Sequence, residues 1–280
     1  MKLKPFDVGL VTTQRHNRWS VGWGTRVPAL TAPHPVAEPV PRPPTGESLV
    51  GNNGSMTTDT ETYRELRGEL ITLARARRDD LETTAPATPE WRVRDLLAHL
   101  GGVCDDVVNG NLADVAANTW TAAQVEKRRG WTIDEVLADW EQRGGEVDAL
   151  IDQAPAGMFG QLLFDAWTHG QDIRGALRAP GGQDSPAAAC SYAWGTEALE
   201  GRDRTDGRPE LSLVTEEGIC VIGSGAPSAT LRASRFELLR AMTGRRSQAQ
   251  VRAFVWDGEP DPERLLLAPF FHPPAGDLVE

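Results

Sequence analysis

The sequence predicts an α+β protein in which helices come first and short strands follow. Three observations carry this expectation. Apolar residues recur at helical spacing in four segments between residues 58 and 179. A Pro-Gly-Gly break follows at residues 180–182, and beyond it the chain changes to short runs of alternating polarity. We therefore expect a helical domain over residues 56–180 and a small α/β domain over residues 181–280.

The helical segments begin at recognisable start signals. Thr58 and Glu61 form one capping box, and Thr132 and Glu135 form another. Within each pair, the side chain of each residue accepts a hydrogen bond from the backbone amide of the other. The expected helices cover residues 58–81, 88–107, 132–151 and 158–179, with a long connection without a helix over residues 109–131. Four amphipathic helices with one long connection predict a four-helix bundle, whose core is a usual place for a metal site.

The second half reads as a mixture of short elements. A helix is expected over residues 185–194, and a third capping box at Ser234 and Glu237 starts another that ends at Gly244. Alternating polarity predicts strands over residues 211–214, 219–222, 230–233 and 251–256.

Composition excludes several function classes. Acidic residues outnumber basic ones by 40 to 29, which argues against nucleic acid or an anionic membrane as the main partner. No apolar run approaches the roughly 18–20 residues that span a bilayer. The three cysteines, Cys104, Cys190 and Cys220, contain no CxxC pair and so predict neither a disulfide framework nor a zinc knuckle. We expect a cytoplasmic protein with small-molecule ligands, either a monomer or a homodimer.

The first 55 residues differ from the rest. Seven prolines lie between residues 28 and 44, which excludes a helix or an interior strand there. The segment carries a formal charge of +3, whereas the remainder carries −14. We expect a disordered arm, although Trp19 and Trp23 leave a small docking element open. We also expect Met56 to start the functional chain, with residues 1–55 an upstream extension from a misplaced start.

Histidine is scarce, and its positions are informative. Of five histidines, two lie in the arm and one in a proline-rich tail, which leaves His99 and His169 within the expected helices. Asp165, His169 and Asp172 follow one another at i, i+4 and i+7, so they share one helical face. A carboxylate and an imidazole on one helix, with an imidazole from another, form the ligand pattern of catalytic zinc and suit other divalent transition metals. A solvated ion pair and a satisfied core histidine are the simpler alternatives.

Two motifs and the tail resemble a known enzyme family. Residues 91–100 read Trp-Arg-Val-Arg-Asp-Leu-Leu-Ala-His-Leu, and the fourth helix carries Asp165-xxx-His169-xx-Asp172. Together with residues 233–247, they resemble the mycothiol-dependent maleylpyruvate isomerase family, within the DinB/YfiT-like metalloenzyme superfamily. The resemblance covers about residues 58–271 and implies a DinB-like four-helix bundle followed by the family's C-terminal domain.

The resemblance also implies a chemistry. A divalent metal, usually zinc, would be held by His99, Asp165 and His169, and its open position would receive the sulfur of mycothiol, the actinobacterial thiol. The implied reaction is isomerisation of a small electrophile, or S-transfer onto one. The family is expected to carry Glu where this chain has Asp165, one methylene shorter. This departure bears on the reaction more than on the metal.

Further residues have candidate roles. We expect Asp172 to lie behind the ligands and to orient His99 through its other ring nitrogen, and a surface ion pair with an arginine is equally open. Arg235 and Arg240 are candidate cations for a carboxylate-bearing substrate or the thiol, although basic residues beside a small helix usually form a solvated face. The competing functions are a metal-binding protein without catalysis and a DinB-like metal-dependent hydrolase that uses water.

The misplaced-start hypothesis gives the first testable prediction. A chain that begins at Met56 should retain the full activity and melting temperature of the 280-residue chain, because the expected folded domains start there. Activity assays and thermal unfolding of the two chains check this. A collapse of the melting temperature in the shorter chain would show that residues 1–55 belong to the folded protein.

Overall fold

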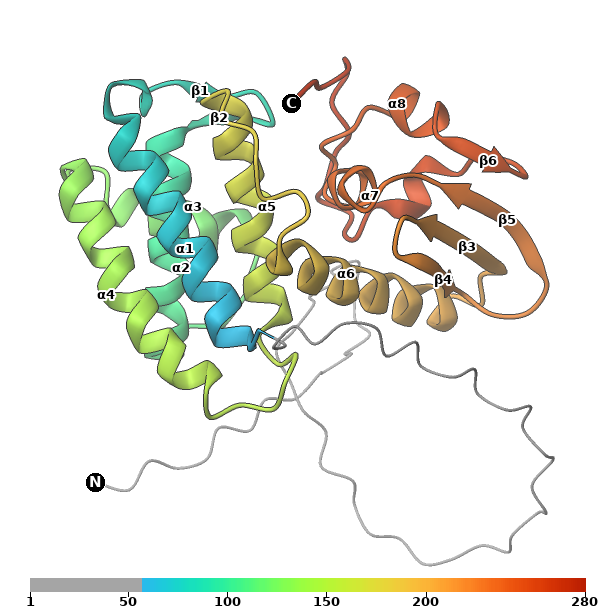
Figure 1. The fold of residues 1–280 in the computed structure, drawn as a ribbon, viewed down its shortest axis with the longest axis horizontal. Coiled ribbons are helices and arrows are strands. Elements are labelled where there is room, and N and C mark those ends of the chain that lie inside the picture. The colour runs from blue at the N-terminus through green and yellow to red at the C-terminus, as the bar shows by residue number, and fades with distance from the viewer. Residues whose placement is uncertain (1–56) are drawn as a thin grey trace, which may run out of the picture. The chain divides into compact units, whose positions relative to one another are not determined.

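Helices and two small sheets make up residues 57–280, the part of the chain that the computed structural model describes (Figure 1). This mixture agrees with the expected α+β class. Residues 58–280 form one unit, so the predicted boundary at residue 180 stays a prediction. The expected arm, residues 1–55, lies outside the described residues. Among residues 57–280, no helix is both long enough and apolar enough to cross a membrane.

Four long helices form the helical part. They are α1 (Asp59–Ala76), α2 (Val93–Asn109), α4 (Ile133–Ile151) and α5 (Gly160–Ala176). α2 packs against α4 and α5, and α1 packs against the same two helices. The apolar faces meet in a core that includes the fully buried Trp140 and Trp167. Both expected capping boxes of this part are present, at Thr58–Glu61 and at Thr132–Glu135.

The expectations for the helical part were wrong in three places. The long connection contains a helix, α3 (Asn118–Lys127), which packs on α2. The second helix does not start near residue 88, because β1 (Thr84–Ala85) and β2 (Thr88–Arg92) form a small antiparallel sheet there. The first helix ends at Ala76 and is followed by a 3₁₀ turn, η1 (Arg78–Asp80).

The C-terminal part begins with α6 (Pro186–Thr205), which extends well past the expected end near residue 194. Its sheet contains β3 (Glu210–Thr215), β4 (Gly218–Ile222), β5 (Pro227–Arg232) and β6 (Val255–Asp257). The strand order is β4-β3-β5-β6; β3 and β5 are parallel, and the other neighbours are antiparallel. One face of this sheet carries the buried side chains Leu211, Leu213, Ile222 and Leu231.

Two helices and a 3₁₀ turn complete the C-terminal part: α7 (Arg235–Met242), α8 (Gln248–Arg252) and η2 (Pro262–Leu265). The strand expected over residues 251–256 is therefore wrong in its first half. A capping box at Ser247 and Gln250 starts α8, and its Val251 is buried. Gly244 follows α7 with a φ of 69°, the left-handed conformation expected of a residue that ends a helix.

A buried ion pair joins α1 to α4. Arg67 donates to the two carboxylate oxygens of Asp148 at 3.0 and 2.8 Å. The guanidinium lies directly against Gly144, where a Cβ atom would come within 2.4 Å of Arg67 Nη1. Glycine is thus required at this position of α4 because any side chain would displace a buried charge from its partner.

This contact predicts different results for two neighbouring glycines. Gly144→Ala should lower the free energy of unfolding by about 1–3 kcal/mol, because the new methyl overpacks the Arg67–Asp148 pair. Gly145→Ala is the matched control, since a Cβ atom at Gly145 would meet nothing within 4 Å. The control should be neutral or stabilising by up to about 1 kcal/mol, owing to the better helix propensity of alanine. Urea unfolding measures both variants, and equal effects would contradict the packing argument.

Candidate metal centre

The three expected ligands lie together. His99 projects from α2, and Asp165 and His169 project from α5, one helical turn apart. Nε2 of His99 lies 3.4 Å from Oδ2 of Asp165, and Nε2 of His169 lies 3.6 Å from Oδ1 of the same carboxylate. One ligand atom from each residue lies within 4.8 Å of the other two. Two segments more than sixty residues apart in sequence thus bring two imidazole nitrogens and one carboxylate to a single point.

The spacing of these atoms fits a metal ion. Ligand atoms about 2.0–2.1 Å from a tetrahedral zinc ion lie roughly 3.4 Å from one another. Two of the converging atoms, Nε2 of His99 and Oδ2 of Asp165, are buried and have no hydrogen-bond partner. Buried polar atoms are normally paired, so two unpaired atoms that face each other call for a ligand between them.

The orientation of His169 is set by Asp172. Nδ1 of His169 lies 3.0 Å from Oδ2 of Asp172, and a carboxylate that is ionised can only accept. The proton of His169 is therefore assigned to Nδ1, which leaves the lone pair of Nε2 facing Asp165. The expectation that Asp172 orients His99 was wrong: it lies one turn beyond His169 on the same helix and bonds that imidazole.

Asp172 is held by two arginines of the C-terminal part. Arg240 Nη2 donates to Oδ1 of Asp172 at 2.7 Å, and Arg245 Nη2 donates to Oδ2 at 2.9 Å. The alternative expectation for Asp172 was an ion pair with an arginine at the surface. The ion pair is present, but it is buried, because the Asp172 side chain is 0% exposed. Arg240 also donates to the carbonyl oxygen of Thr168 and to the carboxylate of Glu280.

His99 is oriented by a residue that sequence reasoning missed. Its Nδ1 lies 2.7 Å from Oε1 of Gln124, which is on α3. The sequence offered little to find this residue, since α3 lies within the segment expected to lack a helix. Gln124 is the one residue of α3 that is buried.

Burial and neighbouring charges shift the pKa values of three site residues. Burial would raise the pKa of Asp165, but the interactions with His99, His169 and Arg245 outweigh it and lower the pKa. Burial lowers the pKa of His169 despite the opposing effect of Asp172. The pKa of Asp172 lies well below its usual value, because Arg245 and Arg240 more than offset the effect of burial. These directions favour two carboxylates and a neutral His169, the protonation states that bind a cation.

Trp91 of β2 forms a wall of the site. Its ring stacks on His169 with the centroids 5.9 Å apart and meets His99 edge-on at 5.2 Å. Trp91 is half-buried and contacts both imidazoles, a role that the sequence analysis did not assign to it. Its position in the 91–100 motif was the available signal.

The two candidate arginines do not contact the converging ligand atoms. Arg240 acts on the site through Asp172. Arg235 is buried beside Glu217, to which it donates, and its backbone N–H donates to Glu216. The simpler alternative, a solvated basic face, is also wrong, because Arg235 is 4% exposed and Arg240 is 0% exposed.

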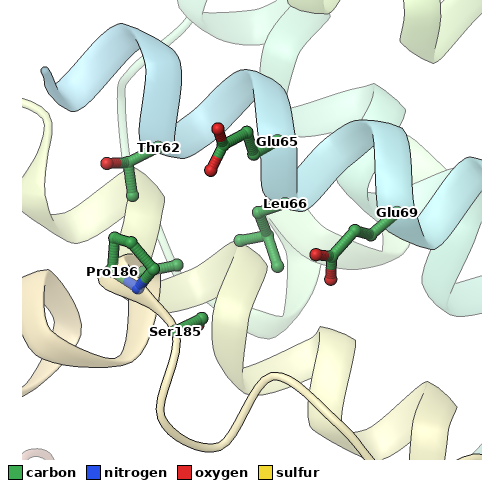
Figure 2. A pocket seen from close by; sticks show the side chains of 7 residues that line it. Thr62, Glu65, Leu66, Glu69, Ser185 and Pro186 are labelled. Carbon is green, nitrogen blue, oxygen red and sulfur yellow. The ribbon is translucent and has the colours of Figure 1, made fainter. Parts of the chain in front are cut away.

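Two other features lie apart from the ligands. Cys104 is buried and hydrogen-bonded with the hydroxyl of Tyr63 at 2.8 Å, and burial raises the pKa of this thiol to about 11, as expected of an inert thiol. A surface hollow between α1 and the start of α6 is shown in Figure 2, with Glu65 and Glu69 on one side and Pro186 on the other. None of the three candidate ligands lines it.

Comparisons with known proteins give one distant likeness. No family model matches the chain, and no curated protein sequence matches it. Among solved structures, the chain is similar to a point mutant of the mycothiol-dependent maleylpyruvate isomerase, at 15% identity and a TM-score of 0.42. It is similar to the mycothiol-dependent maleylpyruvate isomerase itself at 14% identity and a TM-score of 0.38. Both matches cover 68% of this chain and 92% of the other.

The Asp172 network predicts a pH-dependent stability. Asp172→Asn should lower the free energy of unfolding at pH 7 by about 3 kcal/mol, because two buried arginines lose a counter-charge. The folded-state pKa of Asp172 is depressed, so its contribution is complete above the usual value of 3.8 and is lost as the pH falls through the folded value. The difference between wild type and variant should therefore shrink only below about pH 4.

Urea unfolding of the metal-free proteins across pH measures this difference. Asp134→Asn is the control, because Asp134 forms an exposed ion pair with Arg78. An exposed pair of this kind is screened by solvent and contributes little to stability. Equal losses of unfolding free energy in the two variants would show that the buried Asp172 contacts stabilise the protein no more than an exposed ion pair does.

Proposed function

We propose that the chain binds one divalent transition metal ion, zinc in the first instance, through His99, Asp165 and His169. The observation that carries the proposal is the convergence of lone pairs. Asp172 leaves Nε2 of His169 without a proton, and the facing carboxylate of Asp165 has none. Nε2 of His99 and Oδ2 of Asp165 are buried and have no hydrogen-bond partner. Lone pairs that face one another repel unless a cation lies between them. A donor set of two imidazoles and one carboxylate suits zinc and related metals.

We further propose that the metal serves an enzyme of the mycothiol-dependent maleylpyruvate isomerase type. Three protein ligands leave one position open, and the sequence motifs around them resemble that family. A bound divalent cation lowers the pKa of a thiol that coordinates it, so a reactive thiolate is present at neutral pH. The reaction on this proposal is isomerisation of a small electrophile or S-transfer onto one, in the cytoplasm.

The chain's own residues would supply the rest of the site. Trp91 covers the two imidazoles from one side and keeps water from that face. The side chain of Asp165 is 31% exposed, although its Oδ2 atom is buried, so a small molecule would approach the site from the Asp165 side. The positive charge of Arg245 helps to lower the pKa of Asp165 and so to keep this carboxylate ionised.

Metal content tests the first proposal. Purified protein should contain about one equivalent of a divalent metal, and Asp165→Ala and His169→Ala should each lower the content and the affinity strongly, because each removes one of three ligands. His272→Ala is the matched control, since His272 lies in the tail outside the site and should leave the metal content unchanged. Elemental analysis and competition with a chelator measure both quantities. Wild-type protein without metal, or with metal that survives both ligand substitutions, would contradict the proposal.

Thiol binding tests the second proposal. Calorimetric titration of the metal-loaded protein with mycothiol should show saturable micromolar binding that is lost in His99→Ala. A panel of mycothiol and small electrophiles should show turnover with the same dependence on His99. Metal binding without thiol binding would favour the hydrolase that uses water, and binding of the thiol without turnover would favour a binding protein.

A further inference from the structure

We propose that Gln124 is a positioning residue that fixes which ring nitrogen of His99 carries the proton. This inference rests on the proposed metal function and deepens it, because only an unprotonated Nε2 can bind a metal ion. The carrying observation is a chain of two short hydrogen bonds that runs from Asp106 through Gln124 to His99.

The first bond sets the orientation of the Gln124 amide. Nε2 of Gln124 donates to Oδ2 of Asp106 at 2.6 Å, and an ionised carboxylate can only accept a hydrogen bond. The NH₂ group must therefore face Asp106. The reversed amide would bring its oxygen against the carboxylate, and two acceptors would repel. The orientation follows from these partners.

The second bond then sets the tautomer of His99. With its NH₂ group facing Asp106, Gln124 presents its oxygen to Nδ1 of His99 at 2.7 Å. A carbonyl oxygen only accepts, so Nδ1 must carry the proton. The neutral imidazole has one proton, and Nε2 is left with a lone pair. That is the atom with no hydrogen-bond partner, 3.4 Å from Asp165.

Burial removes water as a competing hydrogen-bond partner. The side chains of Gln124 and His99 are 3% and 2% exposed, so water does not compete for either ring nitrogen. The remaining choice is between Gln124, which lies 2.7 Å from Nδ1, and Asp165, which lies 3.4 Å from Nε2, and the shorter contact favours the proton on Nδ1. Asp172 does the same for His169 with a charged acceptor, so both imidazoles are presented to the metal position in the same form.

Contacts with α2 and α4 fix the position of α3, the helix that carries Gln124. One turn after Gln124, the buried Arg128 donates to the carboxylate of Asp139 on α4 and to the carbonyl oxygen of Gly101 on α2. A Cβ atom at Gly102 would lie 2.4 Å from Cβ of Gln124, so α2 carries glycine where α3 approaches. The one fully buried residue of α3 is the polar Gln124, whereas the apolar Trp120 and Val125 are only half-buried, which is unlike a helix that packs only to fill a core.

Nuclear magnetic resonance of the imidazole nitrogens in metal-free protein tests the inference directly. In the wild type, His99 should carry its proton on Nδ1. In Gln124→Met, which has similar length and no strong acceptor, the proton should move to Nε2, where it can donate to Asp165. Gln142→Met, at an exposed glutamine of α4, is the matched control and should leave the tautomer unchanged.

Metal affinity provides a second readout. Gln124→Met should weaken metal binding by about 10–100-fold, the usual effect of losing a residue that orients a ligand. The double variant Gln124→Glu with Asp106→Asn exchanges donor and acceptor between the two side chains at constant net charge. It should restore both the Nδ1 tautomer and the affinity, whereas a merely structural role would leave the tautomer unchanged in every variant.

The outcomes separate this inference from the proposed function. If the wild type binds no metal, the proposed function fails while the tautomer measurement still reads out the role of Gln124. If the wild type binds metal, and Gln124→Met binds it equally with the proton still on Nδ1, this inference alone is overturned. Should Gln124→Met fail to fold, Asp106→Asn provides the test, because it lets the amide turn and should populate both tautomers of His99. A single Nδ1 tautomer in that variant would overturn the inference.

Discussion

The buried carboxylate of Asp172 is the contact on which the site depends. It lies on α5, and its charge is balanced by Arg240 and Arg245, which belong to and follow α7. An unpaired buried charge is so unfavourable that the three groups must stay together. Because the same carboxylate holds His169, the packing of α7 against α5 also fixes the direction of a candidate metal ligand.

The two imidazoles are supported in different ways from different parts of the chain. His169 relies on a charged network that reaches through Arg240 to Glu280 near the end of the chain. His99 relies on the neutral amide of Gln124, which is polarised by Asp106. Both arrangements do one thing: they place a proton on the outer nitrogen and keep the inner lone pair free. Metal ligands need such outer partners as much as they need the inner donor atoms.

The sequence was informative where the physical signal is local. Helical spacing brought Asp165, His169 and Asp172 to one face, and capping boxes marked the starts of α1 and α4 correctly. The signal was absent for α3, a short helix without an apolar period. The partner of Asp172 was also beyond sequence reasoning, because spacing places a carboxylate on a face but not against a particular imidazole. Trp91 was expected on the second helix, whereas it lies on β2, and its contact with both imidazoles depends on that strand.

The central claim is that His99, Asp165 and His169 together hold one metal ion. X-ray absorption spectroscopy at the metal edge of the purified protein tests it most directly, because it counts and identifies the donor atoms. The account predicts nitrogen and oxygen donors at about 2.0–2.1 Å with the scattering of two imidazoles, and one imidazole fewer in His169→Ala. A shell of sulfur donors from cysteines, or a spectrum that is identical in wild type and His169→Ala, would contradict it.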